Sequence, residues 1–408
     1  WNVSGAGHIY QEPFIKEIEA TTQMTLRSTY GLTASMGPAT NSKAVFSNDI
    51  VYRPSQGEKE NQITIIALEN AGLTWEKQYE FNVGLDLGLF DRISISTDFY
   101  TRNMFDLIGI LTTSGIGGES RKAANYAKMK SHGVEFTLGT RNIVSPKFNW
   151  TSNFTFSYNT KKITERNTAS SVMQYLAFSG APKVGNPVRG IYTIPFMGLN
   201  GAGLPTFLNH LGETTVTGVS FQETLNTDFM KYMGSADPKF TGGFDNTFKY
   251  GPFRLNVFFA YQFGSKVWLD QSFSYRYYDN TASPKEMADR WMVPGDEYKT
   301  NIPVIASKRQ HEDEPALRTA YNAYNFSSLR VAKGDFIRLK EVALNYDFQE
   351  NLLKMIGLSS VSVRLSASNL ALLYSDKKLN GQDPEFFRSG GVAMPVPRQF
   401  TLSVKIGF

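Results

Sequence analysis

The chain has 408 residues, no Cys and a formal net charge of +5, and 13% of its residues are aromatic. Without cysteine it has neither a disulfide framework nor a cysteine nucleophile. It has no basic run with interleaved aromatic residues, so the modest positive charge does not indicate nucleic-acid binding. The mean hydropathy is only -0.29, and no apolar run approaches the roughly 20 residues of a membrane-spanning helix. Any crossing of a membrane would therefore be made by strands.

The first predicted strands follow a period of two along the chain. Residues 1–9 are predicted to form a strand, residues 13–20 a short helical turn and residues 24–34 a second strand. A long polar stretch then leads to residues 79–89, where six apolar side chains alternate with polar residues or glycine. Phe90-Asp91 predicts a tight turn into a strand at residues 92–102.

The later predicted strands come mostly in hairpins. Two long stretches between them, residues 161–239 and about 270–333, have little sustained period and many turn residues, and are interpreted as loops. The remaining strands are predicted at residues 134–140, 148–158, 240–250, 253–263, 336–346, 361–373 and 400–408.

The last predicted strand keeps its period of two to the final residue. Thr401, Ser403, Lys405 and Gly407 fall on one face. The other face is apolar and consists of Phe400, Leu402, Val404, Ile406 and Phe408. An unbroken apolar face opposite a polar one suits a strand between lipid and a watery lumen. Taken alone, these residues would also suit the closing strand of a soluble sandwich.

Short and very long connections alternate between the predicted strands. Outer-membrane barrels have short periplasmic turns and long extracellular loops, whereas soluble sandwiches do not usually separate them in this way. The sequence therefore predicts an all-β fold, an antiparallel transmembrane β-barrel, with about eleven strands in this chain. The whole of residues 1–408 is interpreted as a carboxy-terminal barrel portion of a longer protein, because single-chain bacterial barrels have even strand numbers and no signal peptide is visible at residues 1–10.

Residues that could carry chemistry are scattered. The histidines, with no metal-ligand spacing and no cysteine partners, are His8, His132, His210 and His311. Glycine clusters near residues 115–118 and 198–203 lack the strand and helix that flank a phosphate loop. No catalytic triad or acid pair is identifiable from spacing. The sequence predicts no enzyme, no metal site and no cofactor.

An aromatic segment follows the strand at residues 253–263. Its rings could stack on sugars or peptide side chains, and its arginine could hold a carboxylate. The pattern is more typical of an interfacial aromatic girdle with loop packing. The candidate substrate-binding residues are Trp268, Tyr275, Arg276, Tyr277 and Tyr278.

Several phrases along the chain resemble those of SusC/RagA-type TonB-dependent outer-membrane transporters, and they occur in the expected order. They are LRSTYG at 26–31, LTWEK at 73–77, NVGLD at 82–86, GL at 198–199, GLP at 203–205, DPK at 237–239, GGF at 242–244, RW at 290–291, PGD at 294–296, GDFIRLK at 334–340, SNL at 368–370, DPE at 383–385 and PR at 397–398. The resemblance covers nearly the whole chain and corresponds to the carboxy-terminal half of the barrel.

The resemblance implies a plugged barrel of about twenty-two strands in the bacterial outer membrane, of which this chain would supply about half. It implies partners in the form of a SusD-like surface lipoprotein, the TonB complex acting through an amino-terminal part outside this chain, the remaining barrel strands and plug, and outer-membrane lipid. The implied function is import of oligosaccharides or oligopeptides. The terminal apolar face from Phe400 to Phe408 would serve as the assembly signal.

Two alternatives remain open at this point. One is a metal-chelate or cobalamin receptor, which would need no lipoprotein. The other is a surface adhesin or structural barrel, which would need no plug domain. The substrate itself cannot be named from the sequence, because loops select it.

Overall fold

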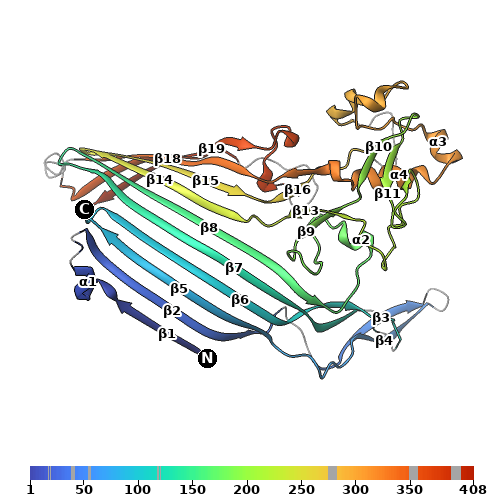
Figure 1. The fold of residues 1–408 in the computed structure, drawn as a ribbon, viewed down its shortest axis with the longest axis horizontal. Coiled ribbons are helices and arrows are strands. Elements are labelled where there is room, and N and C mark those ends of the chain that lie inside the picture. Colours follow the sequence, from blue (N-terminus) through green and yellow to red (C-terminus); the bar gives the residue numbers. More distant parts are fainter. Residues whose placement is uncertain are drawn as a thin grey trace.

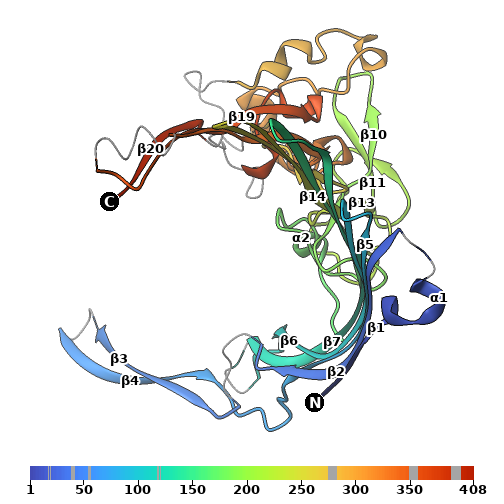
Figure 2. The ribbon, with the colours of Figure 1, turned by 90° about the vertical axis from the view of Figure 1, so that its left-hand side faces the viewer.

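The computed structural model describes residues 1–16, 18, 20–37, 42–53, 57–116, 119, 121–273, 283–348, 357–386 and 397–408. In this part of the chain, an 11-stranded antiparallel sheet runs through the molecule in the order β1-β2-β5-β6-β7-β8-β14-β15-β18-β19-β20. Figures 1 and 2 show that the strands are long and that the sheet curves into an open trough. The all-β antiparallel fold and the strand number expected from the sequence are confirmed.

The eleven strands of the sheet differ in length. They are β1 (Asn2–His8), β2 (Thr21–Ser35), β5 (Glu76–Leu89), β6 (Ile93–Thr112), β7 (Arg121–Val144), β8 (Phe148–Arg166), β14 (Phe240–Tyr250), β15 (Phe253–Phe263), β18 (Phe336–Asp347), β19 (Ser360–Ser375) and β20 (Gln399–Gly407). The hairpin of β14 and β15 has the bounds expected from the alternation. β6, β7 and β8 run well beyond their predicted ends. Residues 103–112, 121–133 and 159–166 are paired with neighbouring strands through the backbone, but their apolar and polar side chains do not alternate regularly.

Pairing in register gives the sheet two distinct faces. Gly84 in β5 lies opposite Arg27 of β2 and Asp98 of β6, so these positions share one face. We call this the polar face, and the side that carries Phe81 and Phe99 the apolar face. Tyr100 and Ser131 on the polar face are buried, whereas Phe81 and Phe99 are 44% and 55% exposed. Side chains on the concave side of a curved sheet lie closer together than those on the convex side. The lower exposure of the polar face therefore fits the concave side of the trough in Figure 2.

Connections of two kinds join the strands. At one end, the turn end, β5 and β6 are joined by residues 90–92, β7 and β8 by residues 145–147, and β14 and β15 by residues 251–252. At the other end, the loop end, β8 and β14 are joined by residues 167–239, and β15 and β18 by residues 264–335. Figure 1 shows these two long connections gathered at the end opposite the short turns. The predicted asymmetry is confirmed.

The two long connections fold together into what we call the loop cap. Its elements are α2 (Val172–Tyr175), β9 (Gly190–Thr193), β10 (Phe196–Leu199), β11 (Pro205–Leu208), β12 (Thr214–Thr215), β13 (Lys231–Ser235), β16 (Lys266–Trp268), η2 (Lys285–Asp289), η3 (Asp296–Tyr298), α3 (Lys308–Asp313), α4 (Leu317–Asn325), η4 (Ser328–Arg330) and β17 (Val331–Lys333). Both stretches are mainly long connections, as expected, but residues 161–166 belong to β8, and the sequence did not predict these short helices and strands.

The loop cap contains the main hydrophobic core of the described residues. Ile191, Ile194, Phe207 and Trp268 are nearly inaccessible to solvent and belong to one cluster. The backbone N–H of Ile194 donates to Phe326 O at 3.0 Å and links the two connections. Short strands of two to five residues, held by this core, carry no periodic pattern that is visible in the sequence.

One hairpin outside the 11-stranded sheet was not expected from the sequence. β3 (Val45–Arg53) and β4 (Glu58–Ala67) lie in the polar stretch between β2 and β5, and Figures 1 and 2 show them projecting from the sheet. Short helices complete the structure: η1 (Ile9–Gln11), α1 (Pro13–Lys16), η5 (Lys377–Leu379) and η6 (Pro384–Phe386). Within the described residues, no helix has the length and apolarity needed to span a membrane.

A buried ion pair joins β18 to the connection that follows β19. Arg338 and Asp383 are 3% and 4% exposed. Arg338 Nη2 donates to both carboxylate oxygens of Asp383 at 2.6 Å and lies 2.8 Å from Glu385 Oε2. Because Arg338 and Asp383 are both almost fully buried, loss of the arginine would leave an uncompensated buried charge on Asp383.

Substitution Arg338→Met is expected to destabilise the loop end of the sheet by about 3–5 kcal/mol, the usual cost of breaking a buried pair. Arg364→Met is the matched control, because Arg364 pairs with Glu341 on the neighbouring strand while both side chains stay partly exposed, and such pairs contribute about 1 kcal/mol or less. The free energy of unfolding and the rate of protease cleavage in the connection after β19, both in the complete protein, measure the difference. Equal effects of the two substitutions would contradict the assignment.

Candidate functional site

Ion pairs line the polar face across β2, β5 and β6. Arg27 Nε lies 2.8 Å from Asp86 Oδ2, and Arg27 Nη2 lies 3.1 Å from Asp98 Oδ2. Asp86 Oδ1 accepts from Ser96 Oγ at 2.6 Å and from Arg27 Nη2 at 3.2 Å. Closer to the loop end, Arg102 pairs with Glu80 at 3.0 Å. Since these side chains come from adjacent strands, the sheet register itself brings opposite charges together.

One glycine makes this network possible. A Cβ atom at Gly84 would lie 2.5 Å from Asp98 Oδ1 and 2.7 Å from Arg27 Nη2. The alternation of residues 79–89 places a polar or small residue at this position, but only the neighbouring strands explain why it is small. The Arg27 guanidinium therefore lies over Gly84, in the space that a larger side chain would occupy.

The apolar face carries aromatic residues near both ends of the strands. At the loop end, Tyr30 stacks on Tyr79 with ring centroids 6.1 Å apart, and Tyr79 stacks on Phe105 at 5.6 Å. At the turn end, Trp150 stacks on Phe248 at 5.7 Å. Two aromatic bands that flank an apolar surface are the pattern found at the interfaces of membrane barrels.

A polar network joins separate segments within the loop cap. Arg330 donates to both carboxylate oxygens of Glu286 at 2.8 and 2.9 Å and to the backbone oxygen of Asp270. The amide of Asn325 accepts from the backbone N–H groups of Ser272 and Phe273, both at 3.0 Å. These contacts fix the segment that leads out of β16.

Burial changes the acidity of several groups in the loop cap. Loss of solvent raises the pKa of both Tyr321 and Tyr324 to about 12, so both phenols are neutral at ordinary pH. The Tyr321 hydroxyl donates to Val304 O at 2.6 Å. Burial also raises the pKa of Asp270, and the charge of Arg330 opposes this shift.

The predicted ligand platform is only partly described. Trp268 is 1% exposed, and its ring packs against Phe178 and Phe326 at centroid distances of 6.0 and 5.8 Å. A ring enclosed in this way has no free face for a ligand, so Trp268 is a core residue of the loop cap in this structure. The other predicted members, Tyr275, Arg276, Tyr277 and Tyr278, lie outside the described residues, and the platform stays a prediction.

The predicted assembly strand lies at an edge of the sheet. β20 pairs with β19 from Gln399 to Gly407. The apolar side chains at its alternate positions are all at least 49% exposed; they are Phe400, Leu402, Val404, Ile406 and Phe408. In the described part of the chain, no other strand pairs with the far side of β20.

The described residues do not form a metal centre. Among the described residues, no three His, Asp or Glu side chains lie close enough together to hold a metal ion. His210 Nε2 lies 3.7 Å from Glu223 Oε2 in the loop cap, which makes a surface contact and not a ligand set.

Sequence reasoning missed most of the polar network. Arg27 and Asp86 lie in phrases that carry the family resemblance, but no role was assigned to them. A usable signal was present, because each is a charged residue at a polar position of an otherwise apolar alternating strand. No sequence signal pointed to the pairing of Arg338 with Asp383, which are 45 residues apart.

Comparison with known proteins connects these features to a family. Residues 9–299 match the family model described as TonB dependent receptor-like, beta-barrel. The chain is 26% identical over 406 residues to TonB-dependent receptor P3 of Formosa agariphila, covering 94% of this chain and 37% of that protein. It is 23% identical over 413 residues to TonB-dependent receptor SusC of Bacteroides thetaiotaomicron, covering 96% of this chain and 38% of that protein.

A similar solved structure supports the fold. The RagAB peptide transporter superposes with a TM-score of 0.80 at 22% identity, covering 100% of this chain and 43% of the matched chain. This chain therefore spans about two fifths of the length of the relatives that it matches. Because the family model matches well over half of the chain, the chain belongs to the TonB-dependent receptor β-barrel family, in which it resembles part of a SusC/RagA-type barrel.

Proposed function

We propose that the chain forms part of the wall of an outer-membrane importer for oligosaccharides or oligopeptides, with the polar face turned to the import path. The observation that supports this most directly is the contrast between the two faces of one sheet. The apolar face lies between two aromatic bands, and the polar face carries paired charges such as Arg27 with Asp86. Lipid on one side and water on the other would stabilise this arrangement.

The direction of the barrel follows from its connections. In this proposal the short turns lie in the periplasm and the loop cap lies outside the cell. A ligand held between the loop cap and a SusD-like surface lipoprotein would enter when the TonB complex displaces a plug. The plug and the TonB-contacting segment would come from a part of the protein outside residues 1–408.

The family membership supports energised import over passive diffusion. A cap with its own hydrophobic core lies at the loop end of the strands from β8 to β18, and folded loops at this end suit a ligand that is first captured and then released inward. The chain contributes no identified catalytic group to this process. Its part would be to form the wall, hold the cap and contribute to ligand selection.

The import function is tested by deleting the gene and, separately, by disrupting TonB. Growth on the cognate oligosaccharide or oligopeptide should be lost in both strains, while growth on the corresponding monomers is retained. The complete protein should also co-purify with a surface lipoprotein. Uptake that continues without TonB would contradict energised import, and a protein without a plug would favour a structural barrel.

Deletion of Phe408 tests the role of β20 as an assembly signal. Its ring is 93% exposed at the end of the apolar face, where the assembly machinery could bind it. We expect several-fold less folded protein in the outer membrane, measured by heat-modifiable mobility on gels. Phe408→Tyr keeps an aromatic end and should assemble normally, and unchanged assembly of the deletion would refute the proposed signal.

A further inference from the structure

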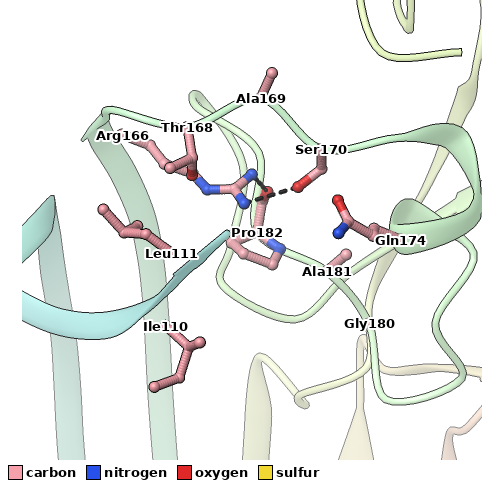
Figure 3. Close-up of a pocket in the computed structure, with 10 residues that line it drawn as sticks. All are labelled: Ile110, Leu111, Arg166, Thr168, Ala169, Ser170, Gln174, Gly180, Ala181 and Pro182. Carbon is pink, nitrogen blue, oxygen red and sulfur yellow. Dashed lines mark hydrogen bonds between the residues drawn. The ribbon is translucent and has the colours of Figure 1, made fainter. Parts of the chain in front are cut away.

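A cavity of about 490 Å³ lies at the loop end of the sheet (Figure 3). We call it the Arg166 pocket. Its lining residues come from the end of β6, the end of β8 and the segment that carries α2: Ile110, Leu111, Arg166, Thr168, Ala169, Ser170, Gln174, Gly180, Ala181 and Pro182. Figure 2 shows α2 on the concave side of the sheet.

The strand register places Arg166 on the polar face. Arg166 lies opposite Ala127 of β7, and paired residues share a face. The register shift in this region places the extra residue, Thr164, in β8, so β7 keeps its alternation from Ala127 to Gly133. Gly133 lies opposite Tyr100 on the polar face. In the proposed importer, the Arg166 pocket would therefore open toward the import path near its outer entrance.

Arg166 is the only charged residue among those that line the pocket. Its Nη1 donates to Pro182 O at 2.8 Å and its Nη2 donates to Ser170 Oγ at 2.7 Å, and both acceptors are neutral. Two neutral hydrogen bonds fix the guanidinium without cancelling its charge. The adjacent acid, Glu165, pairs instead with Lys128 at 2.7 Å.

Three other arginines on the polar face differ from Arg166. Arg27, Arg102 and Arg364 each lie within ion-pair distance of a carboxylate. Among the described residues, no such partner is found for Arg166, and its buried Nε has no hydrogen-bond acceptor. The Arg166 pocket is therefore a place on this wall where a positive charge is held in position and left uncompensated.

A second polar group faces the pocket from the opposite side. Gln174 Oε1 accepts from the backbone N–H of Ser171 at 3.0 Å, as part of the capping box of α2. This contact orients the amide, and in the described structure no hydrogen bond uses its Nε2. Figure 3 shows the Gln174 amide and the Arg166 guanidinium pointing toward the same space, with Ile110 and Leu111 along another side.

We propose that the Arg166 pocket is a subsite for a carboxylate carried by the imported oligomer. This inference rests on the proposed import function and narrows its substrate class. The guanidinium supplies the charge, Gln174 Nε2 supplies a further donor, and the two apolar side chains contact the uncharged body of the ligand. A carboxylate with this recognition chemistry occurs in the uronic acid units of a glycan and at the carboxy-terminus of a peptide.

The test uses the complete protein, purified with its surface lipoprotein, and calorimetric titration with two matched pairs of probes. One pair is trigalacturonic acid and the neutral galactose trisaccharide. The other pair is tetra-alanine with a free carboxylate and the same peptide as its amide. In one of the pairs, the carboxylate-bearing member should bind about tenfold more tightly, a typical effect of one charge-assisted contact, and that pair identifies the source of the carboxylate.

Three substitutions locate the effect in the pocket. Arg166→Gln removes the charge, and Gln174→Glu keeps the capping acceptor while it places a negative charge beside Arg166. Both should abolish the preference for the carboxylate. Arg309→Gln is the control, because Arg309 in α3 is 90% exposed and its loss changes the net charge by the same amount. This variant should keep the full preference.

Two results would overturn the inference. Equal affinity for the charged and neutral members of both pairs would show that no carboxylate is recognised. If Arg166→Gln and Arg309→Gln lost the preference for the carboxylate-bearing probe to the same extent, the preference would come from the net charge of the protein and not from the pocket. In either case TonB-dependent uptake of a neutral oligomer would leave the import function intact, whereas absence of TonB-dependent uptake would count against the import function itself.

Discussion

Strand pairing in one register is the constraint on which the rest of this structure depends. Backbone groups of a strand in lipid must be paired with neighbouring strands, and pairing at a fixed register also decides which side chains share a face. Gly84 opposite both Arg27 and Asp98 is the clearest case. A slip of one residue between β2 and β5 would move Arg27 to the apolar face, where its charge would be unpaired. The polar network and the apolar surface are thus two results of the same pairing.

In the proposed membrane setting, the same constraint would require partners for the edges of the sheet. β1 and β20 are its edges, and among the described residues neither has a partner on its outer side. Exposed strand edges inside a membrane are costly because several kcal/mol are lost for each unpaired backbone group. The chain spans about two fifths of the length of its relatives, and further strands of a longer protein would remove both edges. In that setting the exposed apolar row from Phe400 to Phe408 would face lipid.

The loop cap is organised by a different principle from the sheet. Its two connections fold around a hydrophobic core that includes Ile194 and Trp268, and ion pairs such as Arg330 with Glu286 fix its segments. A rigid cap can hold a small number of polar groups at defined positions, as at the Arg166 pocket. Selectivity for a ligand can then arise from a charge that is left uncompensated, as at Arg166, whereas Arg27, Arg102 and Arg364 on the same face are paired with carboxylates.

The sequence by itself determined the antiparallel all-β fold, the number of strands and the separation of short turns from long connections, because these depend on local alternation and turn residues. It also identified the family through phrases such as GDFIRLK at 334–340. It did not predict the hairpin of β3 and β4, the core of the loop cap, or the pairing of Arg338 with Asp383. Only the structure decided these features. The core of the loop cap and the buried ion pair depend on contacts between residues far apart in the chain, for which a periodic pattern leaves no signal. The hairpin of β3 and β4 is local, but its strands do not keep a strict period of two. The positions of two single residues also depend on such long-range contacts. Trp268 was predicted to lie in a ligand platform but packs in the core of the cap. Arg166 had no distinctive sequence context but lies in a pocket on the polar face.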